Sequence, residues 1–298
     1  MSQPESAERV AQQAATRYMG GVAWPTVILA VVAAATYVGT LLLVVGEQIS
    51  LAPAVIILAL ASYATYTVLH EAAHGSISGN QRGMRWLNEA LGYLAAWVLL
   101  IPMTAHRHEH LAHHRHANMP DDDPDYCVRD FARSPWHAAT VAARVLCSQF
   151  RYYWAHRWGR GRRAQDIYLV AEVVCSLVLR LPLLLWGDWS AGLLAMILGL
   201  LLGVSITLYL FAYLVHRPHA DSGRWVDTST IPLQGVGGAI LSFAWGYQNY
   251  HGIHHLFPRV PWYRYPRLYR DIAEPMQQMG APIYQLDAAG LRRAPALA

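Results

Sequence analysis

The stretch NYHGIHHLFP, residues 249–258, decides the fold, because two earlier histidine clusters match it. LHEAAHGS begins at residue 69 and HRHEHLAHHRH at residue 106. Residues three and four apart lie on the same face of a helix, so each cluster aims two or three imidazoles at one point. The clusters supply eight nitrogen donors, more than one zinc ion uses: His70, His74, His110, His113, His114, His251, His254 and His255.

Imidazoles in these numbers predict a metal centre. A free histidine has a pKa of about 6.5, so most of these rings are neutral at pH 7 and suited to iron, zinc or copper. Without a metal, buried donors and acceptors would stay unpaired, at about 1–3 kcal/mol each. A structural zinc closes with four ligands, so eight favour two metals, and iron keeps positions open for an oxidant.

The composition predicts a membrane protein. Of the 298 residues 54% are hydrophobic and 14% are charged, against about 25% charged in soluble domains. The net charge of +4, with no basic run interleaved with aromatic residues, argues against a nucleic-acid partner. Cys127, Cys147 and Cys175 form no CxxC pair, which argues against a disulfide framework or an iron–sulfur ligand set.

Four apolar segments are long enough to cross a bilayer, which takes about 20 residues, and they form two hairpins. The third of them carries Glu172 and Arg180, which must face other helices or lie near the interfaces. The expected fold is therefore all-α and polytopic, with interfacial helices and a His-rich cap. The four expected spans are Gly21–Gly46, Leu51–His70, Ile167–Trp186 and Ala191–Val215.

A fifth apolar run, Trp86–Met103, must not cross the membrane if the histidines share one site. Crossing would place His110 on the opposite side from His70. We therefore expect this run to be re-entrant, interfacial or packed on other helices, with residues 104–166 forming the cap. Residues 231–248 suit a helix that lies along the membrane surface.

The arginines indicate the orientation. All 23 basic residues are Arg, and only Arg180 falls outside the segments placed on the histidine side. The positive-inside rule then assigns that side to the cytoplasm, in a bacterial inner membrane. We expect residues 1–20 to form a cytosolic tail or short amphipathic helix, 21–270 the membrane domain, and 271–298 a C-terminal tail.

HEAAH, HLAHH and HGIHH, followed by HHLFPRVPWYR, resemble the three histidine boxes of the membrane-bound fatty acid desaturase superfamily. That superfamily includes acyl-lipid desaturases and hydroxylases and bacterial carotenoid ketolases and hydroxylases. The resemblance runs from about residue 60 to 270. AHHRHANMPDDDPDY and LVHRPH are similar to the ketolase branch, and related strings occur among acyl desaturases.

The resemblance implies a non-haem di-iron oxidoreductase that uses O2 on unactivated C–H bonds of a long hydrophobic lipid. A fatty acyl desaturase or hydroxylase is the first prediction, and a β-carotene-type ketolase or hydroxylase is the alternative. A remote alternative, a membrane metal carrier or sensor, would place metal ligands along the spans rather than at their ends.

The resemblance also assigns roles to individual residues. The eight box histidines become iron ligands, with His216 as a further ligand and His219, beyond Pro218, as an additional candidate. His106, His108 and His116 lie off the register of the second box and are expected to be exposed or to support the cap. The residues expected to orient ligands are Asp125, Asp122 and Glu71, as acceptors of a ligand's second N–H, and Asn249, as holder of a water.

The electrons must come from a separate protein. The sequence contains no haem-binding domain, flavin motif or CxxC pattern, so a ferredoxin-like carrier is implied beside the lipid substrate. Such carriers are commonly acidic, and Arg157, Arg160, Arg162 and Arg163 form a basic run that suits one.

Overall fold

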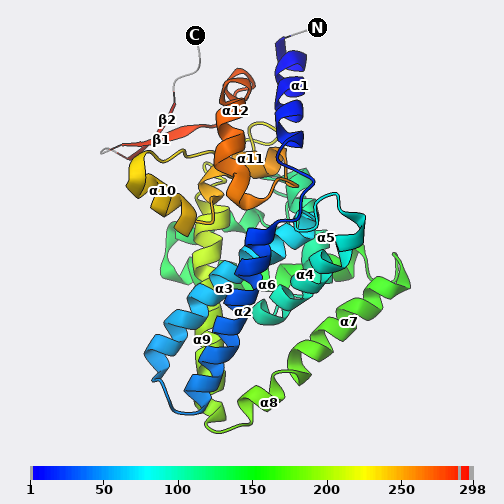
Figure 1. The fold of residues 1–298 in the computed structure, drawn as a ribbon, viewed down its shortest axis with the longest axis vertical. Coiled ribbons are helices and arrows are strands. Elements are labelled where there is room, and N and C mark those ends of the chain that lie inside the picture. The colour runs from blue at the N-terminus through cyan, green and yellow to red at the C-terminus, as the bar shows by residue number, and fades with distance from the viewer. Residues whose placement is uncertain (1–2, 288–289, 295–298) are drawn as a thin grey trace.

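The computed structural model, which describes residues 3–287 and 290–294, is an all-α polytopic membrane protein with one small sheet. Within these described ranges, three helices are long and apolar enough to span a bilayer: α2 (Trp24–Val45), α3 (Leu51–His74) and α9 (Trp189–Thr207), which η3 (Leu208–Tyr213) continues as a π-helix. They run side by side in the lower half of Figure 1. Gly203 lets α9 approach α3, because a Cβ there would lie 2.8 Å from the Cβ of Ser62.

The run at 86–103 does not carry the histidines across the membrane, as predicted. It forms α4 (Arg85–Leu99), after the short η1 (Arg82–Met84), and the chain then turns by 96° into α5 (Met103–His116). Leu100 sits at the break with a positive φ of 57°. The second histidine cluster therefore returns to the end of the bundle where α3 ends.

The span predicted at 167–186 is not one helix, which is a correction. It divides into α7 (Arg163–Val178) and α8 (Leu181–Leu184), and α7 alone, at 16 residues, is short for a bilayer. The pair still carries the chain to the far end, where the Asp188 N–H donates to the Val45 carbonyl at 2.9 Å. The two hairpin turns therefore meet at the bottom of Figure 1.

Two charged residues of the 167–186 segment, Glu172 and Arg180, stabilise the bend between α4 and α5. The Glu172 carboxylate accepts hydrogen bonds from the Met103 and Thr104 N–H groups, which begin α5. Arg180 is buried and donates to the carbonyls of Trp97 and Val98, at the end of α4. A carboxylate at a helix start and a cation at a helix end both complement the helix dipole. Both charges face other helices, as their sequence position predicts.

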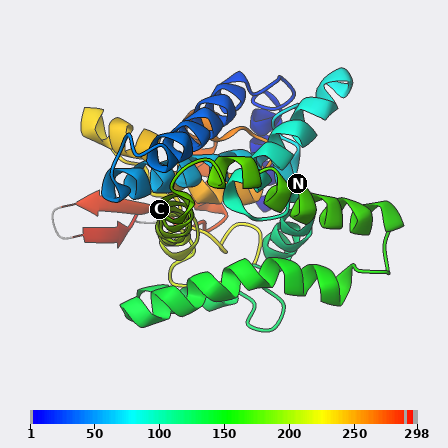
Figure 2. The same cartoon turned by 90° about the horizontal axis from the view of Figure 1, so that it is seen from below.

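The C-terminal part of the cap lies above the bundle in Figure 1, and in Figure 2 the long helix α6 lies on the side opposite to α2. The remaining helices of the cap carry or support the third histidine cluster. The elements are η2 (Tyr126–Arg133), α6 (Pro135–His156), α10 (Gly235–Ala244), η4 (Gln248–Tyr250), α11 (His251–Leu256), η5 (Trp262–Arg264) and α12 (Tyr265–Gln278), followed by the antiparallel strands β1 (Tyr284–Asp287) and β2 (Gly290–Arg293).

The N-terminal segment is helical and packs on the cap. Helix α1 (Gln3–Thr16) buries a stripe of alanines, including Ala11 and Ala15, against Ile272 and Met276 of α12. Tyr18 then donates to Asp271 at 2.8 Å. These contacts cross the domain boundaries predicted at residues 20 and 270, which stay a prediction. Helix α10 exposes Val236, Ile240 and Phe243, as a helix on a membrane surface would.

We predict that Glu172→Ala destabilises the protein by about 1.5–3 kcal/mol, because the first N–H groups of α5 lose a charged acceptor. The measurement is the thermal unfolding midpoint in detergent. The exposed Glu47, in the far turn, is the matched control, and Glu47→Gln should leave the midpoint unchanged. Equal midpoints for Glu172→Ala and the parent protein would contradict this account of the bend.

Candidate metal centre

The structure gathers the histidines into two adjoining groups, each with ligand nitrogens within 4.8 Å of one another. The larger contains His70, His74, His110, His114 and His254, from α3, α5 and α11. The smaller contains His113, His216 and His255. The groups touch where the His114 and His255 rings stack with centroids 4.2 Å apart.

The rings of the larger group converge through their Nε2 atoms. The His110 Nε2 lies 2.9 Å from that of His74 and 3.2 Å from that of His114. The His114 Nε2 in turn lies 2.9 Å from that of His254. One metal ion can accept the lone pairs of several imidazole nitrogens at once. The converging Nε2 atoms of these histidines therefore fit a metal ion.

Protein partners at Nδ1 fix the orientation of several rings. His113 Nδ1 donates to Asp123 at 2.8 Å, and His251 Nδ1 donates to Gln248 at 2.8 Å. An acceptor at Nδ1 places the ring proton there, which leaves the Nε2 lone pair for a metal. His254 and His255 follow the same pattern, with the Tyr265 hydroxyl at 3.0 Å and the Asp227 carboxylate at 3.4 Å.

The smaller group contains nitrogens that lack any protein partner. Neither ring nitrogen of His216 is hydrogen-bonded, although the residue is buried, and the His255 Nε2 is also unpaired. Buried polar atoms in folded proteins are nearly always satisfied. The ring centroids of His113, His216 and His255 lie 4.8–5.3 Å from one another. These three rings, with their unpaired nitrogens, fit a second metal.

His251 and His219 belong to neither group. The His251 ring lies between them, with centroids 5.1 Å from His216 and 5.1 Å from His254. His219 follows a turn after His216, and its ring centroid is 6.4 Å from that of His216. The structure thus brings His216 into a group and leaves His219 beside it.

The predicted carboxylate partners need correction. Asp122 is exposed, and the Asp125 carboxylate lies 4.0 Å from the His113 Nδ1. Asp123 instead makes the contact, and it also accepts from the N–H groups of Asn118 and Asp125. The turn brings Asp123 into hydrogen-bond contact with His113 and leaves Asp125 farther from the same ring, which residue type alone does not reveal.

Glu71 and Asn249 likewise have partners other than those expected. The buried Glu71 accepts from the Thr26 hydroxyl at 2.7 Å and from the Trp262 N–H at 2.8 Å, so it joins α2, α3 and η5. Asn249 donates to the Ile231 carbonyl and the Ser242 hydroxyl. Both brace the backbone around the histidines instead of contacting a ring.

Four partners of the histidines were not predicted from the sequence, and His106 was predicted only to be exposed or to support the cap. The four are Gln149, Gln248, Asp227 and Tyr265. His106 is buried, stacks on His110 at 5.2 Å and donates from Nδ1 to Gln149. A helical signal was available, because His106 stands four residues before His110 and Gln248 three before His251. Asp227 and Tyr265 reach their histidines from other segments and leave no local signal. His108, His116 and His137 are partly buried, and His156 is exposed.

Burial sets the protonation of the groups outside the spans. It lowers the pKa of His110, His114, His216 and His255 well below the usual range, and neighbouring histidines add to the effect. These rings are neutral at pH 7, as metal binding requires. His113 differs: burial opposes its charged form, but the nearby carboxylates of Asp123, Asp125 and Glu109 together outweigh burial and raise the pKa of His113 to about 9.

The cysteines stay apart from both groups. Cys147 and Cys175 are exposed, and burial raises the pKa of the Cys127 thiol to about 11. Because the thiolate is the form that binds metal, the raised pKa disfavours Cys127 as a ligand, and neither imidazole group includes a cysteine. Imidazole nitrogen is therefore the donor that the site offers.

Comparison with known proteins gives the same two branches as the motifs. The family model described as fatty acid desaturase matches residues 47–287. A β-carotene ketolase of Paracoccus sp. (strain PC1) is 29% identical over 69% of this chain and 74% of its own length, and one of strain N81106 / MBIC 01143 is 28% identical over 69% and 73%. A chloroplastic sn-2 acyl-lipid omega-3 desaturase (ferredoxin) of Helianthus annuus is 25% identical over 67% of this chain and half of its own length.

We predict that Asp123→Asn lowers metal affinity by about 10–100-fold, because His113 loses the carboxylate that orients it. The measurement is the metal retained per chain during dialysis against increasing chelator. The neighbouring Asp122→Asn is the matched control and should retain metal like the parent protein. If Asp122→Asn loses metal more readily than Asp123→Asn, then Asp122, as expected from the sequence, is the carboxylate that orients the ligand.

Proposed function

Because the chain belongs to the fatty acid desaturase family, we propose that it is an O2-dependent membrane oxidoreductase with a di-iron centre. Its reaction would be the oxidation of unactivated C–H bonds in a long hydrophobic lipid. The observation that carries this proposal is the pair of adjoining imidazole groups, five rings and three, at one end of the membrane helices.

Iron is the metal that we propose for both groups. Neutral imidazole suits zinc, copper and iron, but eight nitrogens in two groups exceed what a single zinc site takes. When bound, the two irons would supply the activation of O2 with two electrons from outside. His251, between the groups, stands within reach of either metal.

The chain's own residues would orient the ligands and keep the centre dry. Asp123, Asp227, Gln248 and Tyr265 hold ring orientation through Nδ1, which keeps Nε2 toward the metals. Most of the histidines are buried, which limits water at the centre. Tyr66 closes one wall, since its ring contacts those of His70 and Phe211.

Two substrate classes remain as candidates, each favoured by an observation. The acyl chain is the first, supported by the family and by the acyl-lipid desaturase relatives. The carotenoid is the second, supported by two ketolase relatives that match about three quarters of their own length. Removal of a second hydrogen would give an alkene, whereas retention of oxygen would give an alcohol or, after repetition, a ketone.

We further propose a ferredoxin-like electron donor and a cytoplasmic orientation of the histidines in a bacterial inner membrane. The name of one relative includes ferredoxin. In this chain Arg157, Arg160, Arg162 and Arg163 are exposed on the loop between α6 and α7, where an acidic carrier can dock. The concentration of arginine on the histidine side supports the orientation.

Expression in a carotenoid-producing bacterial host tests the reaction. We expect a new double bond or hydroxyl in the membrane acyl chains if the substrate is an acyl lipid, and oxygenated pigment if it is a carotenoid. His216→Ala should abolish the product, because the smaller group loses one of three ligands. The exposed His156→Ala is the control and should match the parent protein.

The outcome that contradicts the proposal is also defined. If neither lipid pool changes while the purified protein holds iron, the oxidase function is wrong. A metal carrier or sensor would then account for the histidine groups. Product formation that persists without O2 would equally overturn the proposal.

A further inference from the structure

Two cavities lie along α4, and the only group histidine among their lining residues is His74, which borders the second of them. A groove of about 1,070 Å³ lies between α4 and α7, and a pocket of about 610 Å³ lies on the histidine side, beside His74. Glu89 lines both cavities. The two cavities therefore approach each other at Glu89, with an apolar lining in the groove and a polar lining in the pocket.

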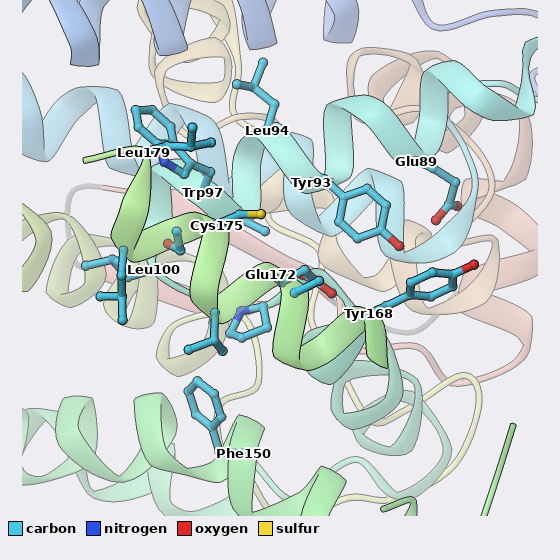
Figure 3. A pocket seen from close by; sticks show the side chains of 16 residues that line it. Glu89, Tyr93, Leu94, Trp97, Leu100, Phe150, Tyr168, Glu172, Cys175 and Leu179 are labelled. Carbon is cyan, nitrogen blue, oxygen red and sulfur yellow. The ribbon is translucent and has the colours of Figure 1, made fainter. Parts of the chain in front are cut away.

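The groove is apolar over most of its length. Figure 3 shows Trp97, Leu100 and Leu179 toward one end, and the oxygens of Tyr93 and Tyr168 toward the other, near Glu89. From Glu89 to Leu100 helix α4 rises by roughly 16 Å at about 1.5 Å per residue. This length and composition suit a hydrocarbon chain with its polar end near the cap.

The pocket is cationic. Arg82, Arg85 and Arg259 line it, and Arg259 is held by the Asn80 side chain at 2.8 Å. Among the described residues no carboxylate forms an ion pair with any of these three arginines. Glu89 is already paired with Arg107 at 2.7 Å, so its charge does not oppose a bound anion. The pocket therefore offers three unpaired guanidinium groups.

Two exposed tryptophans place the pocket at the headgroup level. Trp24 begins α2 and Trp86 lies at the start of α4, and they are 57% and 63% exposed. The Ala23 N–H donates to the Ile77 carbonyl, which ties the start of α2 to the loop that forms the pocket. Tryptophan favours the membrane–water interface. The pocket thus lies among headgroups, and the groove continues from it into the hydrocarbon.

We propose that these cavities bind one anionic phospholipid. Its phosphate lies among Arg82, Arg85 and Arg259, and one acyl chain lies in the groove along α4. A free phosphate would leave the groove unused, and an uncharged lipid would leave the arginines unpaired. The site stands whichever C–H bond the protein oxidises, because it rests on the cavities and their charge.

Because His74 lines the pocket, a bound phospholipid should affect access to the larger imidazole group. His74 lines the pocket and is only partly buried, so the larger imidazole group is open on this side. A headgroup in the pocket covers that opening. Bound phospholipid should therefore slow the removal of metal by a chelator.

The test measures phosphatidylglycerol retained per chain after purified protein is exchanged into detergent. Diacylglycerol is the comparison, because it has the same chains without phosphate. The triple variant Arg82→Gln, Arg85→Gln, Arg259→Gln should bind phosphatidylglycerol about 100-fold more weakly, since each arginine near an anionic lipid contributes about a factor of five. Arg160→Gln, Arg162→Gln, Arg163→Gln removes the same charge from an exposed loop and should bind normally.

A second variant tests the groove. Cys175→Trp, on the exposed face of α7, fills the groove and should reduce phosphatidylglycerol binding while leaving inorganic phosphate binding unchanged. Cys147→Trp, exposed on α6 and outside both cavities, is its control.

Four results would overturn the proposal. The pocket triple variant could retain phosphatidylglycerol as the parent protein does, or the parent protein could retain diacylglycerol equally well. Unchanged phosphatidylglycerol binding by Cys175→Trp would indicate a site for free phosphate only. Finally, the pocket triple variant could retain phosphatidylglycerol but no longer accept electrons from an acidic carrier protein. That result would indicate that the arginines form a protein docking surface instead.

Discussion

The structure depends on the convergence of buried imidazoles whose Nε2 atoms face one another. Wherever Nδ1 carries the ring proton, Nε2 lone pairs 2.9–3.2 Å apart repel one another, and a cation between them removes that repulsion. The surrounding side chains nevertheless enforce this convergence. Asp123 and Tyr265 each hold one ring by Nδ1, and Glu71 joins the helix of the first cluster to the segment that follows the third. The cap is thus built around the two imidazole groups.

The membrane half serves the same constraint. Bringing the second histidine cluster back to the end of α3 requires a sharp break between α4 and α5, and a break inside a membrane protein exposes backbone N–H and C=O groups. Glu172 and Arg180, both on the segment after α6, satisfy groups on either side of that break. The two charges that look costly in an apolar segment are therefore what permits the re-entrant path.

The predictable features are those that leave a local signal. Spacing within the clusters predicted eight histidines, seven of which fall in the two groups, and topology predicted that the run at 86–103 does not cross the membrane. The partners of the ligands were harder, because they depend on turn geometry or on distant segments. Asp123 and Asp125 look equal in sequence, yet the turn directs Asp123 toward His113. Tyr265 and Asp227 lie 11 and 28 residues from the histidines that they contact. The break after Val178 was not predicted either. It accompanies the contacts of Arg180 with carbonyls at the end of α4, which lie 83 and 82 residues earlier in the chain.

The most direct test of the central claim is the metal content of the purified protein together with X-ray absorption at the metal edge. The account expects two irons per chain, one for each imidazole group, with nitrogen as the dominant neighbour. A single zinc per chain, or a metal coordinated by sulfur, would contradict it.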